Sequence, residues 1–360
     1  MKGKKRYYSS AKIRKLHAQY NILLGERSNG KSYDVKSNFI TDAYNDVGEF
    51  VYLRRYSDDI KTINVERYFA DAPIYDITNG EHDTVVAYRN ELFLSKFDDE
   101  GNKVKGKKMG YYLSLNNDER IKSQSFPNVT SIVFEEFITD KIYLPNECNR
   151  LMHFVSTIAR DRDITVWMIG NKINKVCPYF REWNLTNAIN QEIGTIDKYE
   201  FTRHDEDGNP ITTLIAVEQC ESVGTQSKMF FGTAADSITG GVWQSHEVPH
   251  LIGKLEDYTR IYEVLFTDLG FSFVLQLLVK EETGGMFVFC YPAPKNPNRH
   301  IYRKITSEFS IDPLTTNSFN VTINGERIMR DLIKAGKICF SDNMTGTDFN
   351  QVLLNRKGVL

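Results

Sequence analysis

Apolar and polar residues alternate in blocks along the first half of the chain, and these blocks predict strands and helices in turn. Short apolar runs rich in β-branched and aromatic residues, typical of strands, occupy residues 20–24, 50–54, 130–137 and 164–170. Segments with helical spacing lie at 30–43 and 146–159. Because strands that alternate with helices usually pair in parallel, the pattern predicts a mainly parallel sheet covered on both faces.

Two further regions have the pattern of antiparallel hairpins. Residues 84–95 and 109–115 predict two arms joined by a polar tip at 97–108. Residues 198–218 predict a second hairpin, with a turn at 205–210 that contains Asp, Gly, Asn and Pro.

The second half of the chain predicts a separate and smaller domain. Residues 224–253 are rich in Gly, Ser and Thr, which favours a linker or lid. Strand-like segments return at 258–266, 271–279 and 286–291, and a helix is expected at 326–335. We therefore predict an α/β domain at 1–195, a linker or lid region at 196–253, and a smaller α/β domain at 254–360.

Composition narrows the class of protein. The 360 residues suffice for two domains, and the formal net charge of -2 argues against a surface that binds nucleic acid everywhere. The 5 cysteines include no CxxC pair, which argues against a zinc site or a disulfide framework and favours a reducing cytoplasm. No apolar run approaches the roughly 18 residues that span a membrane. We expect a soluble, intracellular protein with no membrane partner.

The most specific motif lies between the run 20–24 and the helix after it. It reads Gly25-Glu26-Arg27-Ser28-Asn29-Gly30-Lys31-Ser32, the GxxxxGKS pattern of a phosphate-binding loop, or P-loop. In this pattern the backbone surrounds an anion, the lysine reaches the β- and γ-phosphates of ATP, and the hydroxyl binds Mg²⁺. A plain glycine-rich turn is the alternative. We predict that these residues and Tyr33 bind nucleotide, and that Lys31 also takes part in catalysis.

The apolar run 130–137 contains two acids near its end. In a parallel sheet, Glu135 and Glu136 are expected at the carboxyl edge, beside the P-loop. We predict that Glu135 and Ser32 bind Mg²⁺ and that Glu136 orients or deprotonates the attacking water; a solvated strand end is the alternative. The long separation from the P-loop leaves room for one more strand, 164–170, between the two motif strands, as in motor and recombinase-like P-loop proteins.

Polar residues after two other elements complete the predicted site. Asn171 follows the run 164–170, where a sensor of the γ-phosphate is expected, although a turn asparagine has the same pattern. Arg160 and Arg162 follow the helix 146–159, where a loop arginine reaches the γ-phosphate of a neighbouring subunit. An exposed cation at a helix end is the alternative for both arginines.

Lysines gather on the predicted hairpin tip at 97–108. Lys105, Lys107 and Lys108 have the pattern of a basic loop that contacts DNA phosphates without reading the base sequence. A charged loop that is merely solvated has the same pattern.

Several motifs in one order and spacing resemble those of the DNA-packaging motor ATPases of φ29-type short-tailed phages, which are terminase-like, additional-strand P-loop ATPases. The likeness runs through most of residues 15–185 and rests on the P-loop and on the segments 51–56, 127–138, 144–147, 160–163 and 178–180. It implies a RecA-like ATPase domain, followed by a smaller nuclease-like domain of RNase H-like fold that has lost its catalytic acids.

The resemblance also implies a function. Members of that family form a ring of five identical subunits, hydrolyse ATP with Mg²⁺, and drive double-stranded DNA through the portal protein into a procapsid. They act in the host cytoplasm, docked on the procapsid. A nucleotide or small-molecule kinase, and a nucleotide switch that is not a motor, remain the alternative functions.

Family roles can be carried over to matching positions. The resemblance makes Glu136 the catalytic glutamate, Arg160 an arginine finger that acts on the neighbouring subunit, and Lys122 a lysine that acts across the same interface. It makes Lys141 a pore-facing contact to DNA. Where the family usually has aspartate, this chain has Glu135.

Overall fold

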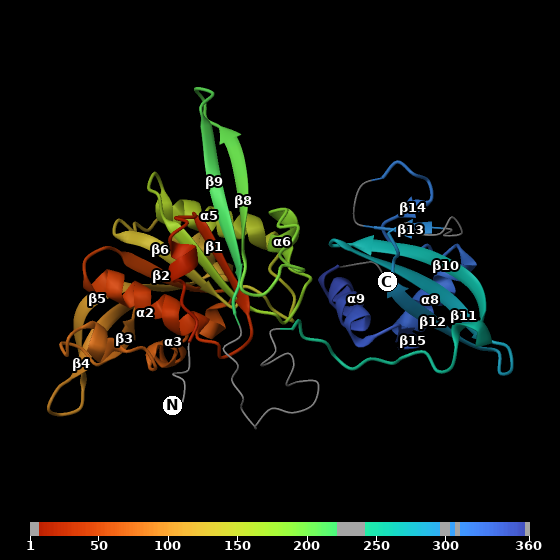
Figure 1. Ribbon diagram of the computed structural model, residues 1–360, viewed down its shortest axis with the longest axis horizontal. Helices are drawn as coiled ribbons and strands as arrows, with labels where there is room; N and C mark the ends of the chain where they lie inside the picture. The colour runs from red at the N-terminus through yellow and green to blue at the C-terminus, as the bar shows by residue number, and fades with distance from the viewer. Residues whose placement is uncertain (1–6, 222–241, 296–302, 307–309, 357–360) are drawn as a thin grey trace. The chain divides into compact units, whose positions relative to one another are not determined.

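The chain folds into two compact units (Figure 1). The computed structural model describes residues 7–221, 242–295, 303–306 and 310–356. Unit 1 takes Met1–Thr139, Leu144–Lys172 and Glu182–Val242, and unit 2 takes Asp140–Tyr143, Ile173–Arg181 and Trp243–Leu360. Two short segments from the middle of the chain therefore belong to the C-terminal unit.

Unit 1 is built on a nine-stranded sheet of order β3-β4-β5-β2-β6-β7-β1-β9-β8. Neighbouring strands from β5 across to β9 pair in parallel, whereas the outer β3, β4 and β8 pair antiparallel. The predicted, mainly parallel sheet is confirmed. Its strands are β1 (Tyr20–Gly25), β2 (Glu49–Arg54), β3 (Thr84–Tyr88), β4 (Glu91–Phe97), β5 (Lys103–Ser114), β6 (Val129–Glu135), β7 (Thr165–Asn171), β8 (Ile196–His204) and β9 (Pro210–Gln219).

The additional strand lies where the sequence predicted it. β7 pairs with β6 on one side, from Ser131 opposite Thr165, and with β1 on the other, up to Gly25 opposite Asn171. All of β1 is buried because it runs through the centre of a sheet that is covered on both faces. The P-loop strand and the strand with the two acids are therefore separated by one strand.

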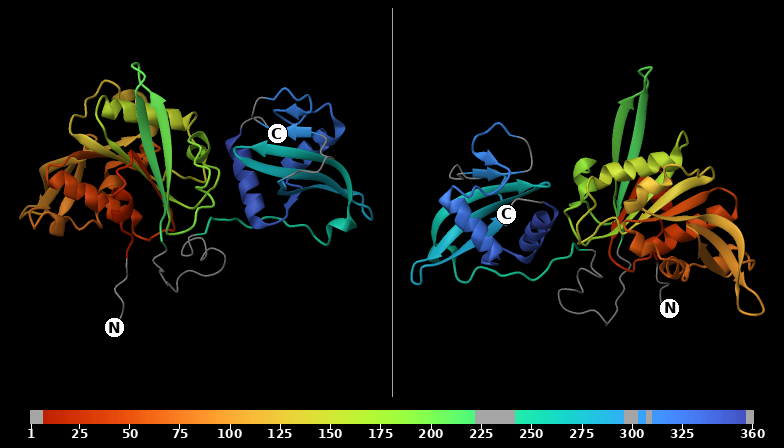
Figure 2. Two further views of the ribbon diagram at one scale, coloured as in Figure 1. Left: turned by 45° about the horizontal axis from the view of Figure 1, so that its top comes forward. Right: turned by 180° about the vertical axis from the view of Figure 1, so that it is seen from behind.

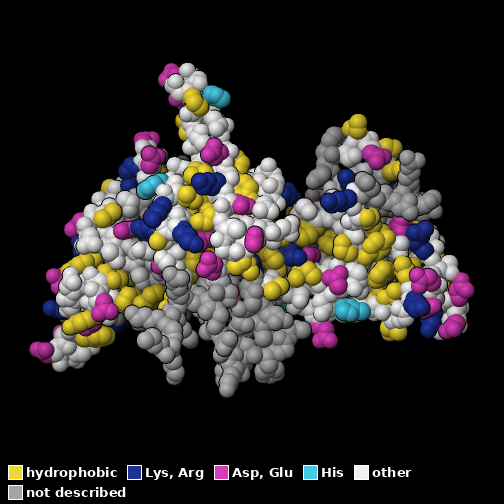
Figure 3. Space-filling model, in the orientation of Figure 1, with side chains coloured by type: hydrophobic (Ala, Val, Ile, Leu, Met, Phe, Trp, Pro, Cys, Tyr) yellow, Lys and Arg dark blue, Asp and Glu magenta, His cyan; other side chains and the backbone are white. Residues whose placement is uncertain are grey.

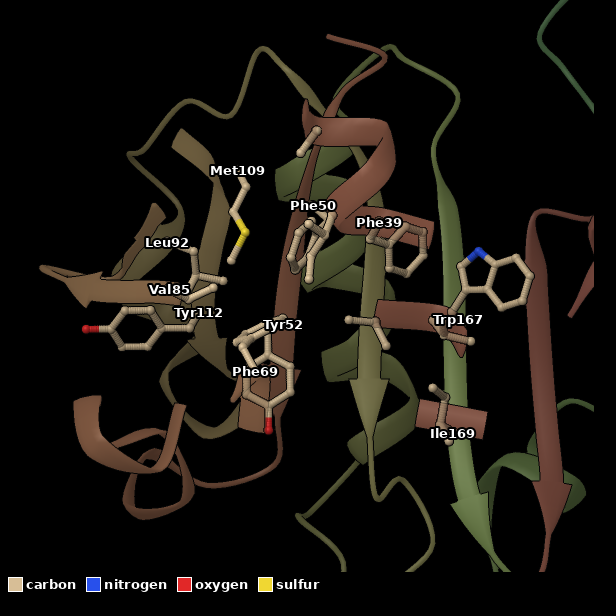
Figure 4. Packing of buried hydrophobic residues seen from close by; sticks show 14 of the residues in the cluster. Phe39, Phe50, Tyr52, Phe69, Val85, Leu92, Met109, Tyr112, Trp167 and Ile169 are labelled. Carbon is tan, nitrogen blue, oxygen red and sulfur yellow. The ribbon is translucent and has the colours of Figure 1, made fainter. Parts of the chain in front are cut away.

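Helices cover the sheet of unit 1. α2 packs on the face seen in Figure 1 and α5 on the other, seen from behind in Figure 2. Beneath α2, Phe39 lies between Phe50 and Trp167, with ring centroids 5.6 and 6.1 Å away (Figure 4). The helices and 3-10 turns are α1 (Ala11–Arg14), α2 (Lys31–Tyr44), η1 (Ser57–Ile60), α3 (Thr62–Phe69), α4 (Ile74–Ile77), η2 (Leu115–Ile121) and α5 (Glu147–Ala159).

The bounds predicted for the basic hairpin tip, 97–108, are wrong. Residues 84–95 hold two strands, β3 and β4, joined by a tight turn in which Arg89 and Asn90 both have positive φ. A nearly unbroken strand-like pattern hides that turn in the sequence. Since β4 then pairs with β5 from Lys103 onward, the tip shrinks to 98–102. The three predicted DNA-binding lysines lie in strand β5 instead of a loop.

The predicted boundary of the first domain at residue 195 is also wrong. The hairpin expected at 198–218 exists as β8 and β9, but β9 pairs in parallel with β1, from Tyr20 opposite Ile215. The end of β9 is buried and apolar, so it extends the sheet of unit 1, while the outer half of the hairpin projects from the unit (Figure 1). Residues 222–241 of the predicted linker lie outside the described residues.

Unit 2 contains a six-stranded sheet of order β14-β13-β10-β11-β12-β15. β10, β11 and β12 are antiparallel, and β13 and β14 then add in parallel beside β10. This is the RNase H-like strand arrangement, extended by β15 next to β12. The elements are α6 (Pro178–Glu182), η3 (Leu255–Asp257), β10 (Thr259–Asp268), β11 (Phe271–Lys280), β12 (Gly285–Pro292), β13 (Arg303–Ile305), β14 (Thr315–Thr316), α8 (Asn324–Lys334), β15 (Ile338–Phe340) and α9 (Asn343–Asn355).

Charges of both signs are mixed over the visible surface. On the face in Figure 3, the coloured basic side chains alternate with acidic ones and form no broad patch of one sign. That mixture agrees with the near-zero net charge of the sequence. Among the described residues, none of the helices is both long and apolar enough to span a membrane.

Candidate nucleotide-binding and catalytic site

The P-loop connects β1 to α2 in the conformation that anion binding requires. Gly30 begins α2 with a φ of 98°, a region that side chains other than glycine rarely adopt. A Cβ on Gly25 would lie 3.1 Å from Asn29 Nδ2 and 3.2 Å from Cys220 Cβ. Both glycines of the motif are therefore needed, one for backbone conformation and one for space.

Lys31 occupies the centre of the loop. Its ammonium donates to the Glu26 carbonyl at 2.6 Å, to Asn29 Oδ1 at 3.1 Å and to Asn171 Oδ1 at 3.4 Å. Burial lowers the pKa of Lys31. Its hydrogen-bond acceptors are all neutral, so an anionic phosphate is a stronger partner for this ammonium than any of them. The contact also brings the predicted sensor Asn171 to the P-loop.

Glu135 lies at the end of β6 beside the start of α2. The side chain is buried and accepts a hydrogen bond of 2.5 Å from the Tyr68 hydroxyl. Burial raises the pKa of Glu135, and hydrogen bonds from Tyr68 and Ser32 lower it in part. A carboxylate and a hydroxyl in contact are hard oxygen donors of the kind that Mg²⁺ prefers, so Ser32 and Glu135 fit the predicted metal. Sequence patterns missed Tyr68, because only folding places α3 against β6.

Glu136 directly follows β6 and is exposed at the sheet edge. Its φ is 54°, and its carboxylate, 57% exposed, accepts a hydrogen bond of 2.6 Å from Arg54 at the end of β2. Strain of this kind in a residue other than glycine is common at functional sites. The predicted catalytic carboxylate is thus accessible and held by an arginine from the neighbouring strand.

Arg55, next to Arg54, has a structural role. Its guanidinium binds both Glu147 carboxylate oxygens, at 2.8 and 2.9 Å, and donates to the Glu136 carbonyl at 3.1 Å and the Phe137 carbonyl at 2.5 Å. This buried network ties the start of α5 to the end of β6. It fixes the backbone from which the Glu136 side chain projects.

Arg160 lies at the opposite edge of the sheet from the P-loop. α5 runs back from the carboxyl ends of the strands, so Arg160, between α5 and the start of β7, lies where the parallel strands begin. A seven-residue strand spans roughly 23 Å, too far for Arg160 to reach the nucleotide of its own subunit. Its guanidinium donates to the Gln124 carbonyl at 3.1 Å, which brings it to the segment that holds Lys122. The two predicted interface residues therefore lie in neighbouring segments.

Arg162 does not fit the predicted interface role. Its guanidinium donates to four carbonyls of its own chain, those of Phe126, Pro127, Val129 and Ile158, at 2.6 to 2.9 Å. These bonds tie the start of β6 to the end of α5. An arginine bonded in this way stabilises its own subunit and keeps only its Nε–H for a further partner, which argues against the interface prediction for Arg162.

The predicted DNA-binding lysines do not form a free basic loop. Lys105 lies 3.3 Å from the ring centroid of Tyr88, Lys107 contacts Asp46 at 2.7 Å, and Lys108 contacts Glu91 at 2.8 Å. Lys141 lies in the short segment 140–143 of unit 2. DNA contact by these four lysines stays a prediction.

Two buried acids of unit 2 form ion pairs with arginines. Asp268 contacts Arg356 at 2.5 Å and Glu326 contacts Arg303 at 3.0 Å, with both carboxylates fully buried. In the part of the chain that the structure describes, no group of three His, Cys, Asp or Glu side chains is placed to hold a metal ion. The nuclease-like strand arrangement thus lacks a nuclease-like metal site in the described residues.

Comparison with known proteins identifies the family of the chain that contains this site. A profile of the podovirus DNA encapsidation protein (Gp16) family matches residues 2–202, which is more than half of the chain. The chain belongs to this family. DNA packaging proteins of Bacillus phage phi29 and Bacillus phage B103 are each 29% identical to it, over 195 and 175 residues. The first match covers 53% of this chain and 54% of the relative, so the chain spans about half the length of the curated relatives it matches.

One solved structure supports the fold over nearly the whole chain. The bacteriophage Phi-29 viral genome packaging motor assembly is similar with a TM-score of 0.52 and 21% identity, over 96% of this chain and 99% of that one. At this identity the similarity supports the fold alone. It agrees with the mainly parallel sheet of unit 1 followed by a smaller sheet in unit 2.

Proposed function

We propose that this chain is the ATP-hydrolysing subunit of a viral DNA-packaging motor. The observation that carries the proposal is the contact of Lys31 with Asn171 at the sheet edge where β6 ends in Glu135 and is followed by Glu136, inside a chain of the Gp16 family. The function named for the phage relatives, DNA packaging, is extended to this chain on that basis.

Each residue of the site has its own role in the proposed reaction. Lys31 and the P-loop backbone bind the ATP phosphates, and Asn171 contacts the γ-phosphate. Ser32 and Glu135 would hold Mg²⁺, which would supply positive charge to neutralise the phosphates. Glu136 orients and deprotonates water once its carboxylate leaves Arg54.

Arg160 is the reason to propose a ring. It lies at the edge of the sheet where the parallel strands begin, so it serves a nucleotide only on a neighbouring copy. We propose a homo-oligomeric ring, of five subunits by the family resemblance, with double-stranded DNA and the portal of a procapsid as partners in the host cytoplasm. A monomeric kinase does not need an arginine that acts on a neighbouring subunit. A nucleotide switch has little need of a water-activating carboxylate such as Glu136.

Steady-state ATP hydrolysis, with and without double-stranded DNA, tests the proposal. DNA should stimulate turnover in the wild-type protein, and Lys31→Ala, Glu136→Gln and Arg160→Ala should each lower it by about 100-fold or more. Mixing Arg160→Ala with Glu136→Gln subunits should restore part of the activity, because some interfaces then combine an intact Glu136 with an intact Arg160. Turnover that ignores DNA and an Arg160→Ala variant with full activity would contradict the motor.

A further inference from the structure

Tyr68 lies beside the proposed Mg²⁺ site, and the proposed function assigns it no role. It is part of α3, and its hydroxyl donates to Glu135 Oε1 at 2.5 Å. Glu135 is the last residue of β6 and is only 5% exposed. An ionised carboxylate accepts several bonds, so one hydroxyl on Oε1 leaves acceptor sites for a metal ion. The contact therefore orients Glu135 without preventing it from binding a metal.

The Tyr68 ring is fixed by aromatic neighbours. It stacks on Tyr52 of β2, with ring centroids 4.5 Å apart, and meets Phe69 in a T-shaped arrangement at 4.9 Å. Tyr52 also packs on Phe69, with ring centroids 5.8 Å apart (Figure 4). Because β2 pairs directly with β6, these rings belong to the same part of the sheet as Glu135. The Tyr68 hydroxyl therefore has a defined position relative to the carboxylate.

Lys36 connects Tyr68 to the helix that follows the P-loop. Lys36 lies in α2, which begins at Lys31, and its ammonium donates to the Tyr68 carbonyl at 2.6 Å. The same ammonium lies 4.6 Å from the centroid of the Tyr68 ring and forms an ion pair with Asp71. A cation over the face of an aromatic ring is attracted to it. One buried lysine of α2 thus holds both the backbone and the ring of Tyr68.

A glutamate that binds a metal ion benefits from such a contact. Several rotatable bonds separate its carboxylate from the backbone, and fixing them costs conformational entropy when the metal binds. A hydrogen bond that already orients the carboxylate removes part of that cost. Losing such a bond next to a metal ligand typically lowers metal affinity about 10- to 100-fold.

We propose that Tyr68 is a positioning residue for the Mg²⁺-binding carboxylate, because its hydroxyl holds the Glu135 side chain ready for the metal that accompanies ATP. This inference rests on the proposed function, since it requires that the P-loop binds the nucleotide. It adds α3 to the elements that build the site, and Tyr68 acts through Glu135.

The test compares Tyr68→Phe, which removes the hydroxyl and keeps the ring, with the matched control Tyr44→Phe. Tyr44 ends α2 at the opposite end from Lys31, and its hydroxyl donates to the Thr78 carbonyl. Calorimetry measures the affinity for ATPγS in Mg²⁺ and in EDTA, and the ratio of the two affinities reports the contribution of the metal. Tyr68→Phe should lower this ratio by roughly 10-fold or more and leave the affinity in EDTA unchanged. Tyr44→Phe should match the wild type in both conditions.

A double-mutant cycle tests whether the hydroxyl acts through Glu135. The side chain in Glu135→Asp is one methylene shorter and loses the contact with Tyr68. Adding Tyr68→Phe to Glu135→Asp should therefore change the affinity ratio by less than about 2-fold. If Tyr68→Phe has the same effect in both backgrounds, the hydroxyl does not act through this carboxylate, and the proposal is overturned.

Two other outcomes would contradict the positioning role. An unchanged affinity ratio in Tyr68→Phe would overturn it while leaving the proposed function intact. An equal loss of affinity in Mg²⁺ and in EDTA would also overturn it, because the substitution would then disturb nucleotide binding without involving the metal. If the wild type binds no ATPγS in either condition, and Lys31→Ala changes nothing, the proposed function itself fails.

Discussion

At the residue scale, the site contains buried charges and a strained backbone that are unfavourable until a ligand binds. Lys31 is buried among neutral acceptors, Glu135 is buried with a raised pKa, and Glu136 has a positive φ. None of these features stabilises the empty protein. Each becomes favourable when phosphate and Mg²⁺ arrive, which is a common property of catalytic sites.

Glu135→Gln should stabilise the protein in the absence of nucleotide. Because burial raises the pKa of Glu135 in the folded state, the folded chain binds more protons here than the unfolded chain, so this group's contribution to stability falls as pH rises. The advantage of Glu135→Gln over the wild type should therefore grow as pH rises above about 5, the usual range of a glutamate pKa in the unfolded chain. Thermal unfolding across that range measures it.

Glu136→Gln provides the comparison, since that carboxylate is more than half exposed and paired with Arg54. If the two variants differ from the wild type by the same amount at every pH, burial of the Glu135 charge is not the cause.

At the scale of elements, function depends on how strand ends are joined. The Arg55 network holds the β6 end against the start of α5, and the four bonds of Arg162 hold the β6 start against the end of α5. α5 is thus tied to the acidic strand at both edges of the sheet. This arrangement keeps Glu136 and Arg160 at fixed positions on opposite edges.

Arg55→Ala should destabilise the protein strongly. The substitution leaves the Glu147 carboxylate buried without its bidentate partner, which typically costs about 3–5 kcal/mol. Lys61→Ala, which breaks an exposed pair with Asp58, should cost at most about 1 kcal/mol. Denaturant unfolding measures both changes, and similar values for the two variants would argue against the network.

At the scale of the whole molecule, the two units have different chemistry. Unit 1 gathers charged and polar groups at one sheet edge, whereas the buried acids Asp268 and Glu326 of unit 2 are each paired with an arginine. Such pairs contribute to packing and occupy these two carboxylates. In the part of unit 2 that the structure describes, a nuclease-like strand arrangement therefore occurs with no group of three side chains placed to hold a metal ion.

The purified protein should not cleave double-stranded DNA in Mg²⁺ or Mn²⁺. Gel analysis of plasmid DNA measures this directly, with Asp268→Asn as the control for a contaminating enzyme. Cleavage that disappears in Asp268→Asn would show that this carboxylate does bind a catalytic metal. Cleavage that persists in that variant would come from another source.

The sequence by itself determined the chemistry that is local in the chain. The P-loop, the apolar strands, the additional strand and the two adjacent acids were all predicted, because each depends on residues that are neighbours in sequence. The antiparallel hairpin β8–β9 was found for the same reason, from its turn residues.

Only the tertiary structure decided what depends on contacts between distant residues. It joined β9 to β1, moved the lysines of β5 out of the predicted loop, gave Arg162 four carbonyl partners, and placed Tyr68 on Glu135. A sequence pattern states the polarity of a side chain, but burial and partners depend on which strands become neighbours. That choice follows from the packing of the whole sheet.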